Sequence, residues 1–216
     1  MNKFSEFTEI EVINKVLKGE KSLYELIVRR FNSALYKIGR SYNYNHDDTQ
    51  DLMQDTYIDA YKNLAQFEQK ANFKTWLIRI MLNHCYHKKQ KFSFKNEKAT
   101  DFVNENSSLI NSNHSNDIMK KIHNRDLGNI IEESLGKLQE DYRLVFSLRE
   151  INGLSVSETA DLLDITESNV KVRLNRAKTQ LRTEIEKSYT ATELFDFNLS
   201  FCNPFTEKLM QTINNL

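Results

Sequence analysis

The segment from Leu154 to Arg182 reads LSVSETADLLDITESNVKVRLNRAKTQLR and predicts two helices joined by a tight turn. Ser155 and Glu158 form the S-x-x-E pattern of a capping box, which starts a helix by satisfying backbone N–H groups of its first turn. Asp164 stands at the turn, where a residue that tolerates the left-handed backbone region is needed. Thr166 is a suitable N-cap for the second helix.

The second predicted helix has one apolar side and one polar, basic side. The apolar residues recur at the spacing of a buried helical stripe: Val170, Leu174, Ala177, Leu181 and Ile185. A short capped helix, a turn and a longer helix with a basic outer face are typical of a helix-turn-helix, whose second helix enters the DNA major groove. A solvated basic face on an ordinary helical hairpin is the alternative interpretation. The candidate DNA-contacting residues are Ser168, Asn169, Lys171, Val172, Arg173, Asn175 and Arg176.

Composition predicts an all-α protein of one or two domains. The chain has 216 residues with only five Gly and one Pro, and its apolar spacing is mostly three to four. Its formal net charge is +0, so a DNA-binding role requires the basic residues to be segregated on one surface. Cys85 and Cys202 give no disulfide framework, and no apolar run is long enough to span a bilayer or resembles a secretory signal. We therefore expect a cytoplasmic protein.

The first half of the chain predicts several amphipathic helices. Ser22 and Glu25 suggest a capping box for a helix that ends near Gly39, and Asp47 or Asp48 suggests the cap of the next helix, which runs to about Leu64. The face of this next helix that carries Asp51, Gln54 and Asp55 is acidic and amide-rich. No partner for acid–base or metal chemistry accompanies these carboxylates. The remaining interpretations are a solvated face or a docking surface for a basic or amide-rich partner.

The segment from Phe67 to Lys91 predicts a helix with an aromatic, apolar stripe, a polar face that includes Arg79 and Asn83, and several lysines at its end. His84, Cys85 and His87 could bind a metal, but they lack a second cluster at ligand spacing, so no metal site is expected. Residues 92–126 are rich in Asn, Ser and Lys and predict a flexible linker. Two further helices, one ending in Asn152-Gly153, precede the helix-turn-helix.

Four motifs carry a resemblance to a known family. The first half contains DTQDLMQDTY at residues 48–57 and FKTWLIRIMLN at residues 73–83, and the second contains LQEDYRLVFSLR at 138–149 and VKVRLNRA at 170–177. In this order, across a low-complexity linker, they resemble bacterial sigma factors of the extracytoplasmic-function (ECF) class, which have only domains 2 and 4. The expected division is domain 2 at 1–91, linker at 92–126, domain 4 at 127–189 and a C-terminal extension at 190–216.

The resemblance implies a non-enzymatic subunit that binds core RNA polymerase and directs promoter-specific transcription. Asp51, Gln54 and Asp55 match the surface that docks on the β′ clamp helices, and the candidate residues of the helix-turn-helix match the reader of the −35 element. A flipped base of the −10 element would be captured by the loop from Phe67 to Phe73 together with Asn83. The residues expected to contact the −10 element are Phe67, Phe73, Lys74, Trp76, Arg79, Asn83, Lys88 and Lys89. The implied partners are core RNA polymerase (β′ clamp helices and β flap), promoter DNA and an anti-sigma factor, with no cofactor, no metal and no small-molecule substrate.

Two other interpretations stay open at the level of sequence. One is a stand-alone helix-turn-helix regulator with a ligand pocket in residues 1–91. The other is a sigma-like interaction protein that no longer recognises promoters, since Val172 stands where the family more commonly has Ser. The extension contains an apolar patch of Leu194, Phe195, Phe197, Leu199, Phe201 and Phe205. We expect this extension to fold back on one of the two domains.

Overall fold

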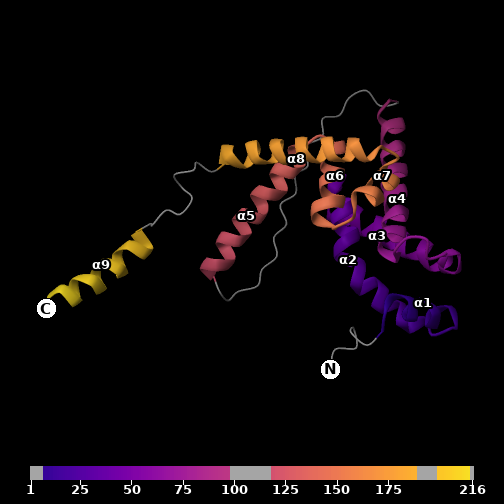
Figure 1. Cartoon of the computed structure of the whole chain (residues 1–216), viewed down its shortest axis with the longest axis horizontal. Coiled ribbons are helices and arrows are strands. Elements are labelled where there is room, and N and C mark those ends of the chain that lie inside the picture. Colours follow the sequence, from indigo (N-terminus) through magenta and orange to yellow (C-terminus); the bar gives the residue numbers. More distant parts are fainter. Residues whose placement is uncertain (1–6, 98–117, 189–198, 215–216) are drawn as a thin grey trace.

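The computed structural model describes residues 7–97, 118–188 and 199–214, and within these ranges every regular element is helical, as the sequence predicts (Figure 1). A first lobe contains α1 (Glu9–Leu17), η2 (Lys21–Leu23), α2 (Tyr24–Ser41), α3 (His46–Lys62), η3 (Leu64–Gln66) and α4 (Phe73–Glu97). A second lobe contains α5 (Ile118–Lys137), α6 (Glu140–Phe146), the π-helical turn η4 (Ser147–Ile151), α7 (Val156–Leu163) and α8 (Glu167–Ser188). The last helix is α9 (Leu199–Asn214).

Helix extends into both ends of the segment that the sequence indicates as a linker. α4 continues to Glu97 and α5 begins at Ile118, whereas the expected linker covers residues 92–126. Residues 98–117 lie outside the described part of the chain. The division into domains at these positions remains a prediction.

Two expected helix caps are wrong. No side chain caps α2, which begins at Tyr24 directly after the 3-10 turn η2 and not from a capping box of Ser22 and Glu25. Helix α3 is capped by Asn45, whose side chain accepts a hydrogen bond from the Asp48 backbone N–H at 2.8 Å. Several cap-forming residues stand together here, and the expected caps, Asp47 and Asp48, lie in the first turn instead, where their charges favour the helix dipole.

α2 ends at Ser41, near Gly39 as the sequence predicts, and Gly39 itself lies inside the last turn of the helix. Gly39 is buried where α2 meets α3 and α4, and a Cβ atom placed on it would lie 2.5 Å from Thr49 Cγ2 and 3.1 Å from Met81 Cε. Both distances are shorter than ordinary carbon–carbon contacts. Gly39 is therefore the position that lets these three helices approach closely.

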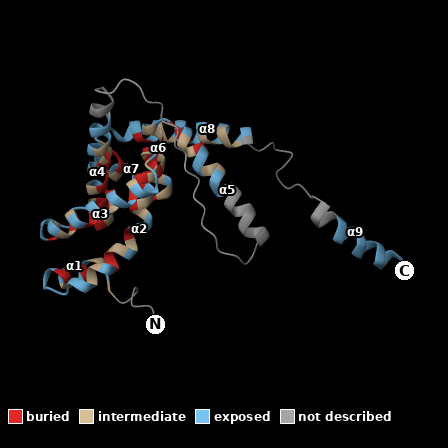
Figure 2. Ribbon diagram, turned by 180° about the vertical axis from the view of Figure 1, so that it is seen from behind, coloured by how far each residue is buried: buried red, intermediate tan, exposed pale blue. Residues whose placement is uncertain are grey.

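The two lobes share one hydrophobic core. Leu144, Leu148 and Leu154 of the second lobe belong to the same buried cluster as Ile27, Leu35 and other residues of the first lobe. Figure 2 shows the buried residues gathered around α2, α3, α4, α6 and α7, with α9 exposed. The smaller cluster of Val145, Ala160 and Val170 lies within the second lobe.

A buried arginine joins the lobes. Arg143 on α6 is only 6% exposed, and its Nε donates to the carbonyl oxygen of Ser41 in the first lobe at 2.5 Å. Its Nη1 donates to the carbonyls of Gly136 and Leu138 in its own lobe, at 3.0 and 2.8 Å. Burial lowers the pKa of the Arg143 guanidinium, and the nearby Glu140 carboxylate opposes this effect.

The C-terminal helix does not fold back. α9 lies apart from both lobes (Figure 1), and Phe205, Leu209, Met210 and Ile213 are 45–58% exposed. The expectation that the extension covers one of the lobes is therefore wrong for the described residues. Residues 194, 195 and 197 of the expected apolar patch lie outside them.

Gly39→Ala tests the close packing of α2. An alanine gains up to about 1 kcal/mol in helix propensity, but the clash with Thr49 costs typically about 1–3 kcal/mol. We expect the overpacking to dominate, so the free energy of unfolding in urea falls. Gly128→Ala in α5 is the matched control, because a Cβ there meets no atom within 4 Å and should leave stability unchanged or raise it. A Gly39→Ala protein as stable as the wild type would contradict this account.

Candidate nucleic-acid interface

The helix-turn-helix forms as the sequence predicts. The Ser155 side chain accepts from the Glu158 N–H at 3.1 Å, and the Glu158 carboxylate accepts from the Ser155 N–H at 2.8 Å. Asp164 has φ 52° and ψ 49°, in the left-handed region expected for the turn. The Thr166 hydroxyl accepts from the Asn169 N–H at 3.2 Å and so caps α8. Val170 and Ala177 are fully buried, which fixes the side of α8 that faces outward.

The candidate residues on α8 divide into two groups. Ser168, Asn169, Lys171, Val172 and Asn175 are exposed. Arg173 and Arg176 also contact their own lobe: Arg173 pairs with Asp141 at 3.2 Å, and Arg176 Nη1 donates to the Tyr142 hydroxyl at 3.1 Å. These two contacts hold the guanidinium groups beside the outward face of the helix.

An aromatic cluster stands at the start of α4. The ring centroids of Phe67, Phe73 and Trp76 lie 5.1–5.4 Å from one another, and Phe73 also contacts Phe31 at 5.7 Å. Phe73 is only 2% exposed, so it is a core residue that supports the half-buried Phe67 and Trp76. Phe67 and Trp76 are thus the members of this cluster that reach the surface.

Four polar or basic side chains on α4 differ in their surroundings. Asn83 is exposed, whereas Arg79 Nη2 donates to the Asp161 carbonyl of α7 at 3.5 Å. Lys88 forms an ion pair with Asp48 at 2.5 Å and lies 5.5 Å from the centre of the Tyr44 ring. Lys89 forms an ion pair with Glu140 of the second lobe at 2.7 Å. In this arrangement both lysines therefore have intramolecular partners.

The start of α4 is bonded to the helix-turn-helix. Asn72 caps α4, because its Oδ1 accepts from the Thr75 N–H at 2.8 Å. Glu158, the capping-box carboxylate of α7, accepts from the Thr75 hydroxyl at 2.7 Å and from Asn72 Nδ2 at 3.1 Å. Lys74 Nζ donates to the Asn152 carbonyl. Asn72 is recognisable in the sequence as a favoured N-cap before Phe73, but the contact with Glu158 has no sequence signature.

The charge of Glu158 stabilises this contact between the lobes. The Ser155 backbone N–H and the Thr75 hydroxyl hold the pKa of the Glu158 carboxyl below its ordinary value of 4.5. A carboxyl whose pKa is lower in the folded state supplies stability that is complete above its ordinary pKa. This stability is lost as the pH falls through the lowered pKa. At neutral pH the Glu158 carboxyl is ionised, so this contribution to stability is complete.

The acidic, amide-rich face of α3 is exposed. Asp51, Gln54 and Asp55 are exposed, and so is Ile58 one turn further on, at 42%. Among the described residues, none forms a side-chain hydrogen bond or an ion pair with these two carboxylates or this amide. This face is therefore available to another molecule.

The metal-capable residues of α4 have other surroundings. His84 Nε2 lies 3.0 Å from the Asp59 carboxylate, and Cys85 is fully buried. Burial raises the pKa of the Cys85 thiol to about 12. Within the part of the chain that the structure describes, no three His, Cys, Asp or Glu side chains are placed to hold a metal ion. No helix there is long and apolar enough to cross a membrane.

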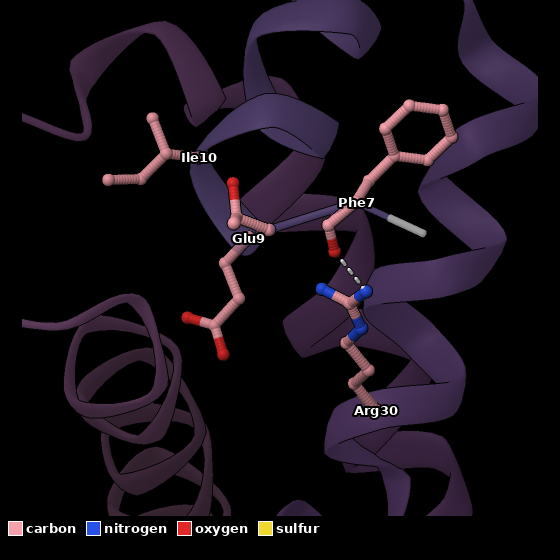
Figure 3. A pocket seen from close by; sticks show the side chains of 5 residues that line it. Phe7, Glu9, Ile10 and Arg30 are labelled. Carbon is pink, nitrogen blue, oxygen red and sulfur yellow. Dashed lines mark hydrogen bonds between the residues drawn. The ribbon is translucent and has the colours of Figure 1, made fainter. Parts of the chain in front are cut away.

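The first lobe has a shallow hollow at its N-terminal end. This hollow of about 530 Å³ is open to solvent and is lined by Phe7, Thr8, Glu9, Ile10 and Arg30. Arg30 Nη2 donates to the Phe7 carbonyl at 2.5 Å (Figure 3). This hydrogen bond engages the guanidinium group that could otherwise orient a ligand. The hollow gives no support to a ligand-sensing first lobe.

Both lobes match profiles of one family. The profile described as Sigma-70 region 2 matches residues 27–92, and that described as Sigma-70, region 4 matches residues 128–181. Together they cover more than half of the chain, in the order and at the positions of the two lobes. The chain belongs to the sigma-70 family and is an ECF-type RNA polymerase sigma factor. It directs promoter-specific transcription initiation and is not an enzyme.

Relatives from Haemophilus influenzae and Bacillus subtilis are similar over most of this sigma factor. It is 26% identical to the ECF RNA polymerase sigma-E factor of Haemophilus influenzae over 84% of its own length and 97% of that protein. It is 27% identical to the ECF RNA polymerase sigma factor SigW of Bacillus subtilis, over 80% of its length and 94% of the relative.

Two solved structures share the fold. CnrH in complex with the cytosolic domain of CnrY is 23% identical with a TM-score of 0.57, covering 82% of this sigma factor and 97% of that chain. RpoE in complex with the anti-sigma factor NepR from Bartonella quintana is 21% identical with a TM-score of 0.62. The match covers 76% of this sigma factor and 96% of that chain.

Thr75→Val tests the contact between the lobes of the sigma factor. The change keeps the shape of the side chain but removes the hydroxyl that donates to Glu158. A hydrogen bond to a charged group contributes about 1.5–3 kcal/mol, so we expect the equilibrium to shift toward separated lobes by roughly ten- to a hundredfold. The distance between spin labels at Ser33→Cys and Gln180→Cys, both exposed positions on opposite lobes, measures this shift in a Cys202→Ser background.

Thr75→Ser is the matched control, because it retains the hydroxyl and should keep the wild-type distance distribution. Equal distance distributions for the wild type, Thr75→Val and Thr75→Ser would show that this hydrogen bond does not hold the lobes together.

Proposed function

We propose that the sigma factor docks on the β′ clamp helices of core RNA polymerase through Asp51, Gln54 and Asp55. The observation that carries this proposal is the exposure of these three side chains, which have no intramolecular partner among the described residues. Buried or already paired carboxylates would have to give up existing contacts before binding. The exposed Ile58 adds apolar area beside them. An exposed apolar residue beside unpaired charges is typical of a protein-binding surface, because the charges can pair across the interface.

For the −10 element, we propose that a base extruded from the duplex binds beside Asn83, Trp76 and Phe67. Extrusion costs a few kcal/mol, which stacking on an aromatic ring and hydrogen bonds to the base edge offset. The half-buried Phe67 and Trp76 supply aromatic surface, and the exposed Asn83 amide supplies a donor and an acceptor. Phe73 acts indirectly by supporting both rings. Lys74, Arg79, Lys88 and Lys89 bind strand phosphates once they leave their present partners.

For the −35 element, the outward face of α8 enters the major groove. Asn175 and Lys171 are exposed there, with Ser168 and Asn169 at the N-terminal end that lies deepest in helix-turn-helix complexes. Arg173 and Arg176, held beside this face, contact phosphates or guanine edges.

Reading both elements at once requires the lobes to separate. Elements centred 25 base pairs apart lie about 85 Å apart along the duplex, at about 3.4 Å per step. The longest described helix of the second lobe, α8, has 22 residues and spans about 33 Å. Two lobes that share one core cannot cover this distance. The arrangement in which the lobes share a core is therefore a state of the free protein. Docking of polymerase on the α3 face, and of its β flap on domain 4, favours the arrangement in which the lobes are separated.

We further propose that an anti-sigma factor regulates this protein. CnrH and RpoE, which share its fold, are each named in complex with a partner: the cytosolic domain of CnrY and the anti-sigma factor NepR. A partner of this class binds at the surfaces used for polymerase or at the contact between the lobes. The compartment that fits a polymerase subunit is the cytoplasm.

Asp55→Ala tests the docking face. One charge-assisted contact contributes about 1.5–3 kcal/mol, so its loss is expected to weaken binding to core RNA polymerase by roughly 10- to 100-fold. The unfolding transition should not change. Binding is measured by titrating labelled protein with core polymerase from the organism that encodes it. Glu25→Ala removes an exposed carboxylate of α2 that is not part of the proposed docking set and pairs with Arg29; it is the control and should bind as the wild type does. Unchanged holoenzyme assembly with Asp55→Ala would refute the assignment.

A further inference from the structure

Val172 is an apolar side chain in the middle of the outward face of α8. It is 47% exposed, and among the described residues of the second lobe it is the only large hydrophobic side chain that is exposed. Successive residues of a helix are rotated by about 100°, so positions 168, 172, 175 and 179 point away from the buried Val170 and Ala177. Val172 is therefore surrounded by polar residues on the face that would meet DNA.

Neither packing nor helix formation accounts for this residue. Its side chain belongs to neither hydrophobic cluster of the structure. Valine is also a weaker helix former than most residues, because its branched side chain loses rotamer freedom. An isolated apolar residue on a surface needs no explanation in general. The position of Val172 needs an explanation, because a helix that reads the major groove contacts base edges with its first two turns.

The chemistry of valine restricts what it can read. Its side chain has no hydrogen-bond donor or acceptor, so it cannot contact the polar edge of any base. The apolar group that a base pair presents in the major groove is the 5-methyl group of thymine. We propose that Val172 packs against the 5-methyl group of one thymine in the −35 element and makes that thymine a determinant of promoter choice. This inference rests on the proposed reading of the −35 element by α8.

Replacing thymine by uracil tests this contact, because uracil forms the same base pair but lacks the methyl group. The holoenzyme is assayed on a promoter that it transcribes, with each thymine of the upstream element changed to deoxyuridine in turn. At one position we expect initiation at subsaturating holoenzyme to fall about fourfold, the ratio that corresponds to ~0.8 kcal/mol for one buried methyl-sized group. The other positions should show no comparable loss.

Two variants connect the effect to Val172. Val172→Ser removes both methyl groups and should transcribe the thymine and uracil templates equally at that position. Val172→Thr retains one methyl group and should retain a preference for thymine. The unfolding midpoint of both variants should match the wild type, because the side chain is exposed and makes no packing contact in either cluster.

The outcomes separate this inference from the proposed function. If transcription occurs but no thymine-to-uracil change reduces it, or if Val172→Ser keeps the same preference as the wild type, the inference is wrong and the sigma function stands. If no DNA fragment yields a transcript that depends on the protein, both the inference and the proposed reading of the −35 element fail.

Discussion

The arrangement of the molecule depends on the buried guanidinium of Arg143. It donates to the Ser41 carbonyl at the end of α2 and to the Gly136 and Leu138 carbonyls that precede α6. These groups are backbone acceptors at helix ends, which cost free energy when they are buried without a partner. One side chain therefore satisfies carbonyls of both lobes, and the leucines that follow it on α6 and η4 complete the core of the first lobe. Removing the guanidinium would leave several polar groups unsatisfied at once.

The same residues that build the helix-turn-helix also hold the lobes together. Glu158 closes the capping box of α7 and accepts bonds from Asn72 and Thr75 at the start of α4. Lys74 and Arg79, on the helix proposed to bind the −10 element, donate to carbonyls of the second lobe. The surface proposed to bind one promoter element is thus partly occupied by the lobe proposed to read the other. In contrast, the acidic face of α3 and the outward face of α8 remain exposed, so the two faces proposed to bind polymerase and the −35 element are accessible while the lobes are in contact.

The local features of the helix-turn-helix were predictable from the sequence, whereas the caps of α2 and α3 and the contacts between distant segments were not. The capping box at Ser155, the left-handed turn at Asp164 and the cap at Thr166 depend only on neighbouring residues, and all three are confirmed. The end of α2 near Gly39 was predictable, but the close packing at Gly39 was not, because it depends on Thr49 and Met81 of two other helices. Phe73 belonged to the expected DNA-binding set, but its burial shows that it supports the rings beside it. The partners of Lys74, Arg79 and Arg143 in the opposite lobe are main-chain carbonyls. Every residue has such a carbonyl, so the sequence does not indicate which one is the partner.

Run-off transcription tests the sigma function itself, with core RNA polymerase from the organism that encodes this chain and fragments of that organism's own DNA. We expect discrete transcripts that appear only when the protein is added and whose start sites share two upstream elements at a fixed spacing. Binding of the protein to polymerase or to DNA without any such transcript would contradict it.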